Sequence, residues 1–555
     1  MNASSPIRKW LVLAGLVPGL FLAMADALIM SLAIAELIQV FGSSVPTVSW
    51  VVNGYNLVLT LLFLPFGRLA DRFGHKLVFV LGLVVFTGAS LGCALSPTIA
   101  WLIGFRGLQA VGAAAIVPVS LPILMNAFPK HQQGFASGLF GAISSLSASI
   151  GPVLAGVLID ARDVVWPAIH LHDSWQLIFF INIPIGLLGI VLAVTLIPSR
   201  GRVTSEAHID LPGIALSSAG LFCLTLGLIQ SNSWHWTSAR VLGLFAVAAV
   251  TLTLFVFWEL RATVPLFDLR LLKRRAFGAA ASGIMTVDIA LSGTAIMFSM
   301  YMIALMDYTS RRAGVVIFVM PLAGLILAPL TGKVLDRVGP RWPAVIGALL
   351  SATGLVALAH LSRSAPLGDV VWRMSLVGIG IGISVPSLMA AGMTALPADV
   401  KAAGSGVLNT ARQLGFVLGV SILIAIFGVT MNDAVQTAAD TARAQTAAAP
   451  FLSDESRTAI YEAIANVEHV DATSNMEKIY EIAHPLADVL NPSGIAELAS
   501  MLQLKDALEK LYLDEVAGAF RWPLYAAALF ALLSAPAGWL LGGRLGSGEP
   551  RDEVG

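Results

Sequence analysis

The chain has 555 residues, of which 57% are hydrophobic and only 12% are charged, and its mean hydropathy is +0.83. Soluble proteins carry about 25% charged residues, so this composition cannot supply a water-facing surface and indicates a membrane protein. Acidic and basic residues balance at 33 each, which excludes the basic face that nucleic-acid binding requires. The two cysteines, Cys93 and Cys223, lie in apolar runs; a disulfide framework and a zinc site are excluded, and no cofactor is expected.

Fourteen apolar runs are each long enough to cross a bilayer, which needs about 20 residues per helix. Backbone polar groups inside a bilayer must be bonded within their own segment, so the sequence predicts an all-α polytopic fold. The first run follows Arg8 and Lys9 and passes AMADA, which resembles a signal-peptide cleavage site, but it continues to Ile34 and is therefore interpreted as a span. The predicted spans are 11–34, 48–66, 77–97, 101–127, 137–159, 175–197, 211–230, 240–259, 277–304, 313–331, 343–361, 371–396, 404–429 and 521–543.

Basic residues in the short loops predict how these spans are oriented, because such residues collect on the cytoplasmic side. The loops on one side carry many basic residues, whereas those on the other side carry chiefly Arg162, Arg311, Arg312 and Arg363. Both termini are therefore expected to be cytoplasmic in a multi-pass inner-membrane protein, as an even number of spans requires. The basic residues of the cytoplasmic loops are Arg68, Arg72, Lys76, Lys130, Arg200, Arg202, Arg261, Arg270, Lys273, Arg274, Arg275, Lys333, Arg337, Arg341 and Lys401.

Residues 430–520 contain no apolar run that could span, and they are expected to lie outside the cell. They hold 15 acidic and 5 basic residues, a net charge of −10 in a chain that is neutral overall. Apolar residues recur at helical spacing in 456–470 and 495–516. We expect an acidic, helical, extracytoplasmic insertion that offers a surface to a protein partner; a solvated acidic loop is the alternative.

Two polar decapeptides repeat one pattern in this hydrophobic chain: GRLADRFGHK at 67–76 and GKVLDRVGPR at 332–341. If the seventh and eighth spans are an insertion, each decapeptide follows the second helix of a six-helix half. Two related halves with a substrate site between them are a recurring transporter plan. The predicted domains are an N-terminal half at 1–200, two inserted helices at 201–262, and a C-terminal half at 263–555 that contains the 430–520 insertion.

The first decapeptide, through Gly67, Asp71, Arg72 and Gly74, resembles the cytoplasmic loop motif of the major facilitator superfamily. The resemblance implies the major facilitator fold, with Asp71 as an electrostatic latch on helix ends that closes the cytoplasmic side. The alternative for the loop alone is a positive-inside anchor.

The second decapeptide repeats the motif through Asp336 and Arg337. It has Lys333 and Pro340 where the first copy has Arg68 and His75. The first copy is therefore expected to be the better latch.

Further motifs resemble the fourteen-helix drug:proton antiporter branch of this family. RGLQAVGAA places Arg106 inside a span, and in the similar family motif the arginine assists proton transfer. GPVLAG, with Gly151, Pro152 and Gly156, looks like the motif associated with antiporters. The stretches SWVVNGYNL, SWQLIFFINIPIG and GSGVLNTARQLG resemble helix sequences of the branch, and the last of them carries the intramembrane charge Arg412.

Two acidic residues lie well inside predicted spans, Asp26 in the first helix of one half and Asp288 in the first helix of the other. Apolar surroundings disfavour a charged carboxylate, so such a group can bind and release a proton as its hydration changes. Together with Arg106, they are the predicted proton-coupling residues. The alternative is a structural pairing of each carboxylate with a partner such as Arg106 or Arg412.

The substrate is expected to bind between the halves, where polar side chains and soft methionines meet. The sequence contains no phosphate-binding loop and no metalloprotease or hydrolase motif, so a secondary active transporter is favoured over an enzyme. We predict proton-coupled efflux of lipophilic, cationic small molecules; a dedicated metabolite, lipid or siderophore exporter and a sensor or scaffold are the alternatives. The expected substrate contacts are Asn53, Tyr55, Asn56, Gln109, Asn182, Met297 and Tyr301.

Overall fold

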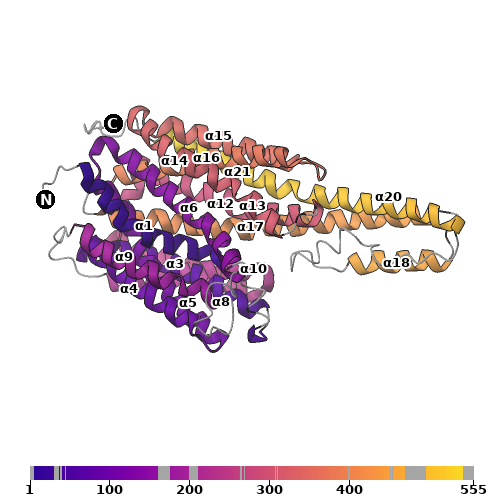
Figure 1. Ribbon diagram of the computed structural model, residues 1–555, viewed down its shortest axis with the longest axis horizontal. Coiled ribbons are helices and arrows are strands. Elements are labelled where there is room, and N and C mark those ends of the chain that lie inside the picture. The colour runs from indigo at the N-terminus through magenta and orange to yellow at the C-terminus, as the bar shows by residue number, and fades with distance from the viewer. Residues whose placement is uncertain are drawn as a thin grey trace.

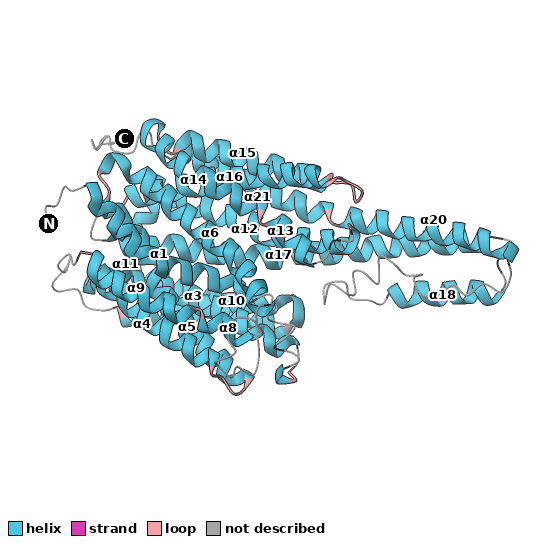
Figure 2. Ribbon diagram, viewed as in Figure 1, coloured by secondary structure: helices cyan, strands magenta, loops and turns pink. Residues whose placement is uncertain are grey.

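The computed structural model describes residues 6–30, 37, 40–43, 45–160, 175–198, 210–262, 265–267, 269–306, 308, 310–397, 400–449, 452, 454–468 and 495–541. Throughout these ranges the regular structure is helical, and no strand occurs in them (Figure 2). Thirteen candidate spans in this part of the chain are long and apolar enough to cross a membrane. A further helix, α6 (Gln133–Asp160), stands where the fifth span was predicted. The predicted all-helical membrane fold is confirmed.

The N-terminal part forms a bundle in which the sixth predicted span is broken. Its two pieces, α8 and α9, meet at Ile181, and Pro184 follows in the first turn of α9. Proline lacks the N–H that an upstream helix would need to continue, whereas it is well suited to a first turn. The other helices of this part are α1 (Pro6–Ile29), α3 (Val45–Phe73), α4 (His75–Ala94) and α5 (Ile99–Ala127); the broken span is α8 (Trp175–Phe180) with α9 (Asn182–Leu196), and a 3₁₀ turn η1 (Lys130–Gln132) precedes α6.

Two helices, α10 (Leu211–Trp234) and α11 (Ala239–Arg261), lie between the two bundles in the sequence. The first packs against α3 of the N-terminal bundle and also against α17 of the C-terminal bundle, where the Ser421 hydroxyl donates to the Leu228 carbonyl at 2.9 Å. The second packs mainly on α10 and exposes a broad apolar face. α10 therefore covers one seam between the bundles, and α11 packs on the outside of α10.

Two helices of the C-terminal part, α17 and α20, project past the bundle on one side (Figure 1). At 1.5 Å per residue, the 47 residues of α17 extend about 70 Å, more than twice the hydrocarbon thickness of a bilayer. The extension of α17 packs against α18 and α20 to form a helical hairpin. The helices are α12 (Arg275–Leu305), α13 (Ser310–Ile317), α14 (Val319–Val338), α15 (Arg341–Ala359), α16 (Leu367–Thr394), α17 (Lys401–Ala447), α18 (Asp454–Glu468), α20 (Ile495–Ala519) and α21 (Arg521–Leu540), with a 3₁₀ turn η2 (Leu269–Lys273) before α12.

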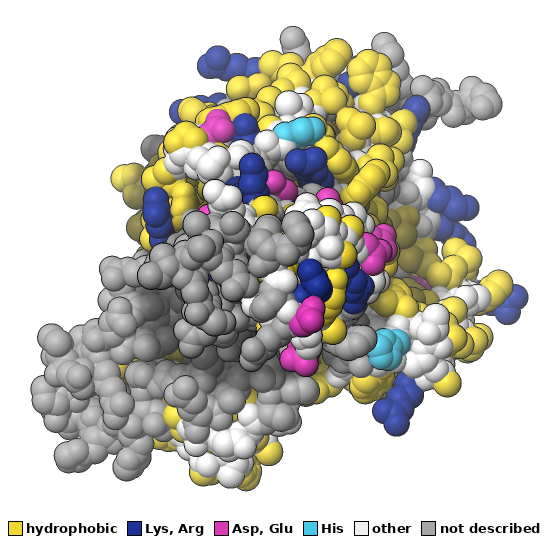
Figure 3. All heavy atoms as spheres, turned by 90° about the vertical axis from the view of Figure 1, so that its right-hand side faces the viewer, with side chains coloured by type: hydrophobic (Ala, Val, Ile, Leu, Met, Phe, Trp, Pro, Cys, Tyr) yellow, Lys and Arg dark blue, Asp and Glu magenta, His cyan; other side chains and the backbone are white. Residues whose placement is uncertain are grey.

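The hairpin is fastened to the C-terminal bundle where α20 passes into α21. There the ring of Phe520 lies 4.6 Å from the ring of Phe427 and 5.4 Å from that of Tyr301, measured between centroids. Thr430 donates to the Ala519 carbonyl at 2.9 Å. Seen from the hairpin side, charged side chains of both signs lie across the end face, and hydrophobic side chains cover the upper flank (Figure 3).

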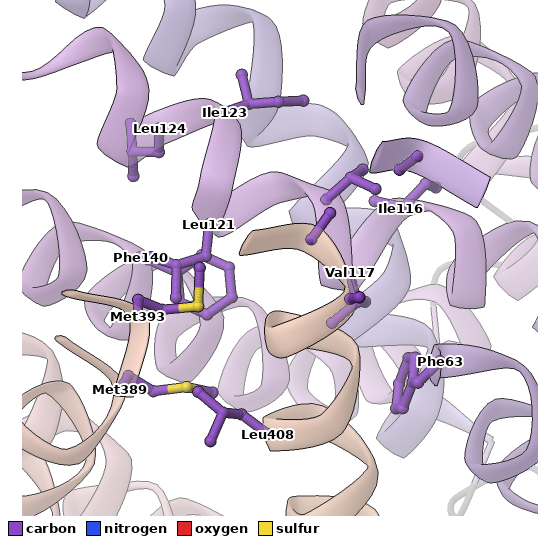
Figure 4. Packing of buried hydrophobic residues seen from close by; sticks show 14 of the residues in the cluster. Phe63, Ile116, Val117, Leu121, Ile123, Leu124, Phe140, Met389, Met393 and Leu408 are labelled. Atoms are coloured by element: carbon purple, nitrogen blue, oxygen red, sulfur yellow. The ribbon is translucent and has the colours of Figure 1, made fainter. Parts of the chain in front are cut away.

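Among the described residues, buried side chains form one hydrophobic core that both bundles share and two further cores that each belong to a single bundle. The shared cluster includes Leu121 and Phe140 from the N-terminal bundle and Met389, Met393 and Leu408 from the C-terminal one (Figure 4). Two further clusters each draw on a single bundle. The bundles are thus packed together in one region and have their own cores elsewhere.

Candidate functional site

An ion pair is buried inside the N-terminal bundle. The Arg106 guanidinium of α5 donates through Nη1 to the Asp26 carboxylate of α1, and neither side chain has more than 1% of its surface exposed. Arg106 Nε also donates to the Val51 carbonyl at 3.1 Å, and the guanidinium lies over the Tyr55 ring, 4.2 Å from its centroid. Charges so deeply buried are tolerated only when they are paired and hydrogen-bonded.

Two amides complete the surroundings of the Asp26 carboxylate. Gln109 Nε2 and Asn182 Nδ2 donate to the same oxygen, Oδ1, at 3.2 and 3.5 Å. Each of these amides also donates to the Ser90 hydroxyl, at 2.8 and 3.5 Å respectively. Gln109 Oε1 accepts from Arg106 Nη1 at 2.7 Å, so this side chain contacts both members of the ion pair. Side chains of α1, α4, α5 and α9 therefore form one polar network.

Local backbone features bring these side chains together. Asn182 begins α9 immediately after the break at Ile181. On the other side of Asp26, α6 approaches α1 so closely that a Cβ on Gly151 would lie 2.5 Å from the Ala25 carbonyl oxygen. Gly151 thus permits the close approach of two helices beside the ion pair. Pro152 and Gly156 follow it in α6.

A second Asp–Arg pair lies in the C-terminal bundle. Arg412 Nε of α17 donates to Asp288 Oδ2 of α12 at 3.3 Å. The Asp288 side chain is 9% exposed and that of Arg412 is 27% exposed, so this pair is more accessible than the first. The next residue, Gln413, donates through Nε2 to Asn56 Oδ1 of α3 at 3.1 Å and so connects the two bundles.

Asp71, in the first decapeptide, binds the start of a helix that belongs to the other bundle. Its two carboxylate oxygens accept from the backbone N–H groups of Ala402 and Ala403, at 3.0 and 2.7 Å. These are the second and third residues of α17. The first N–H groups of a helix have no partner within the helix and carry partial positive charge, so a carboxylate stabilises them.

The second decapeptide makes the reciprocal contact. Asp336 at the end of α14 accepts from the N–H groups of Gly134 and Phe135 at 2.7 and 3.1 Å. These are the second and third residues of α6, in the N-terminal bundle. Each bundle therefore supplies one aspartate and one helix start. We call the two contacts the paired caps, and the end of the molecule that carries the two decapeptides the motif end.

Glycines let the helices of the two bundles approach closely enough for the paired caps to form. A Cβ on Gly67 would collide with the Ala402 carbonyl oxygen, and one on Gly332 would lie 2.6 Å from the Gly134 carbonyl oxygen. Gly74 and Gly339 occupy the same place in each decapeptide and have φ of 103° and 89°. L-residues rarely adopt such positive values, so both glycines are required by the turn that ends each motif.

The structure separates the predicted site residues into several groups. Three residues that were expected to contact the substrate surround the buried Asp26–Arg106 ion pair: Tyr55, Gln109 and Asn182. Met297 and Tyr301 lie in the C-terminal bundle's own core, and the Tyr301 hydroxyl donates to the Leu361 carbonyl at 2.8 Å.

The remaining predicted residues lie nearer the seam and the surface. Asn56 contacts the other bundle, and Asn53 is half-buried on the same helix. Arg72 is half-buried with its guanidinium 5.1 Å from the Phe73 ring centroid, and Arg337 is exposed.

Sequence reasoning missed Ser90 and Gln413. Both are uncharged residues in apolar helices, and such residues are usually unremarkable. Only the position of Gln413 beside the intramembrane Arg412 could have drawn attention to it.

The sequence profile of the Major Facilitator Superfamily matches residues 16–420. The chain belongs to the major facilitator superfamily. It is 28% identical over 428 residues to the tetracenomycin C resistance and export protein of Streptomyces glaucescens, a match that covers 77% of each chain. It is 30% identical over 417 residues to the multidrug resistance protein Stp of Mycobacterium tuberculosis (strain CDC 1551 / Oshkosh), and that match covers 75% of each.

A solved structure shows the same fold. The human organic anion transporter MFSD10 superposes with a TM-score of 0.54 at 14% identity, over 76% of this chain and 93% of that one. The family profile and the curated relatives thus confirm the resemblance to the major facilitator superfamily, and this protein is a membrane transporter.

The buried ion pair predicts an asymmetric response to substitution. Arg106→Met leaves the Asp26 carboxylate without its charged partner and should destabilise the protein by about 3–5 kcal/mol, whereas Asp26→Leu together with Arg106→Met should recover most of that loss. Thermal unfolding of the purified protein measures both effects. Asp440→Asn, which removes one member of an exposed pair, serves as the control. A single Arg106→Met variant as stable as the parent would contradict the prediction that the buried Asp26 carboxylate needs a charged partner.

The close approach at Gly67 predicts that an added methyl group keeps the motif end from closing. In Gly67→Ala, a reporter cysteine made by Leu408→Cys, at a buried position of the shared core, should react with a maleimide faster than in the parent. Gly107→Ala is the matched control, because a Cβ there meets nothing within 4 Å. Equal labelling of the two glycine variants, each corrected for the native cysteines, would show that Gly67 does not limit closure.

Proposed function

We propose that this transporter exports lipophilic small molecules from the cytoplasm in exchange for protons, by alternating access of its two bundles. The observation that carries the proposal is the pair of intramembrane Asp–Arg contacts, one in each bundle. Both aspartates lie on the first helix of their bundle, the position that can line a central pathway. Relatives named for tetracenomycin C export and multidrug resistance support the direction and the substrate class.

Each Asp–Arg pair provides a place for a proton to act. Binding of a proton neutralises the carboxylate, which removes its attraction for the guanidinium. The arginine must then donate to another acceptor, and the two helices lose the electrostatic attraction between carboxylate and guanidinium. Because Asp288 and Arg412 are more accessible than Asp26 and Arg106, we propose that the C-terminal pair exchanges its proton first.

The paired caps supply the conformational step. We propose that the motif end faces the cytoplasm, as the basic residues of its loops favour. With both caps made, this structure would then be closed toward the cytoplasm and represent the outward-oriented state. Opening the other way separates Asp71 from α17 and Asp336 from α6, after which water must bind the freed N–H groups.

The second pair and the first cap lie on one helix, which offers a route between them. Arg412 and Gln413 are about three turns along α17 from the N–H groups that Asp71 binds. A shift of α17 that follows release of Arg412 would therefore act on the cap and on the Gln413–Asn56 contact together. We propose α17 as the element that couples protonation to closure.

The cationic character of the substrate rests on the two intramembrane carboxylates. Each already has an arginine against it, so a cationic ligand must displace that arginine or bind while it is released. A lipophilic ligand of no fixed charge meets no such requirement. We therefore propose lipophilicity as the shared property of the substrates, with cations as one group among them; a dedicated metabolite, lipid or siderophore exporter is the alternative.

Proton exchange can be measured directly in inverted membrane vesicles. Addition of ethidium or another transported compound should dissipate an imposed proton gradient in vesicles that contain the parent protein. Asp26→Asn and Asp288→Asn should each abolish that response, because an amide cannot take up and release the proton. Asp433→Asn, on the exposed hairpin, should behave as the parent. A double Asp26→Asn, Asp288→Asn variant that still responds would refute the coupling assignment.

A further inference from the structure

We propose that Gln109 and Asn182 are positioning residues that set the proton affinity of Asp26, and not contacts for the substrate. This inference rests on the proposed function, since it assigns these amides a part in the coupling step. Both residues were predicted from the sequence to bind substrate. Their bonds in the folded protein point to a different role.

Both donors and the carbonyl of Gln109, and both donors of Asn182, are already engaged in hydrogen bonds. A primary amide offers two N–H donors and one carbonyl acceptor. Gln109 directs its donors to Asp26 and Ser90, and its carbonyl accepts from Arg106. Asn182 likewise directs its donors to Asp26 and Ser90. A ligand would have to break these bonds before it could accept a hydrogen bond from either amide.

Burial also separates these amides from a ligand. Gln109 is 0% exposed and Asn182 is 6% exposed, and both lie within the N-terminal bundle. Phe179 and Asn182 stand on either side of the break between α8 and α9, and the Phe179 ring centroid is 5.9 Å from the Arg106 guanidinium. The broken helix thus brings an aromatic ring to the cation and an amide to the anion. This arrangement serves the ion pair and leaves the amides enclosed.

The chemical consequence concerns Asp26 Oδ1, an oxygen that both amides approach. Two amide N–H groups directed at one oxygen favour the charged carboxylate over the neutral acid. Removal of either donor makes the charged form of Asp26 less favourable, so Asp26 binds its proton at a lower proton concentration, that is, at a higher pH. Gln109 has an additional effect, because its carbonyl also holds Arg106 in place.

Within the described part of the chain, three charged or titratable groups face Asp26 from the neighbouring helices. Arg106 of α5 pairs with it, and Tyr55 of α3 and Cys93 of α4 lie close enough for their ionised forms to interact with its charge. A tyrosine and a cysteine are ordinarily neutral near pH 7. Substitution of the two amides leaves these groups in place, so a change in the pH profile reports on the amides.

The test uses reconstituted vesicles and two probes of different charge, ethidium as a cation and chloramphenicol as a neutral compound. Gln109→Met and Asn182→Leu remove the donors with little change in volume. The pH dependence of exchange should move to higher pH by about one unit, which is a tenfold change in proton affinity. The shift should be the same for both probes, and KM measured at each variant's own optimal pH should stay at the parent value.

Control variants separate positioning from substrate contact. Asn53→Leu changes a half-buried asparagine on α3 and should leave the pH profile in place. If Asn182→Leu does not fold, Asn182→Ser keeps a hydroxyl donor and should shift the profile in the same direction by a smaller amount. Thermal unfolding identifies any variant that has lost its structure.

The outcomes distinguish this inference from the proposed function. If the parent exchanges protons but the variants show an unchanged profile, or a KM change for one probe only, the positioning role is wrong. If the parent itself shows no proton exchange with any transported probe, the proposed function fails and this inference fails with it.

Discussion

We propose that the arrangement of the two bundles depends on the paired caps. Asp71 and Asp336 each neutralise the positive start of a helix in the opposite bundle, and each does so through the second and third N–H groups of that helix. Hydrogen bonds to a charged group are stronger than neutral ones, and water can bind the same N–H groups once a helix start is exposed. Such contacts can hold a large apolar interface together and still be broken in every transport cycle.

Buried charge imposes the second constraint. The Asp26–Arg106 pair is enclosed by amides and a hydroxyl, whereas the Asp288–Arg412 pair is partly accessible and lies beside a contact between the bundles. The molecule thus places one carboxylate in an enclosed polar network and another where protonation can act on the interface. In the proposed cycle, α17 transmits the second event to the cap that Asp71 forms at its start.

The fold could be predicted because its causes are local. Apolar runs of spanning length specify helices, and the repeated decapeptides imply two equivalent bundles. The contacts around the two Asp–Arg pairs were harder to predict, since they depend on tertiary packing. Gln109 and Asn182 were assigned to the substrate because polar residues in a span suggest a pathway, and their bonds to Asp26 appear only once the helices are packed together. Ser90 carries no charge and gave no signal, although its hydroxyl joins both amides.

A distance between two spin labels shows most directly whether the paired caps hold the motif end closed. Phe73 and Val338 occupy the same place in the two decapeptides and are both exposed, at 37% and 53%. Labels at these positions should give a predominantly short distance in the parent protein. A longer distance should become dominant when Asp71→Asn and Asp336→Asn are combined, because an amide binds a helix start less strongly than a carboxylate. An unchanged distance distribution in the double variant would contradict the role assigned to the caps.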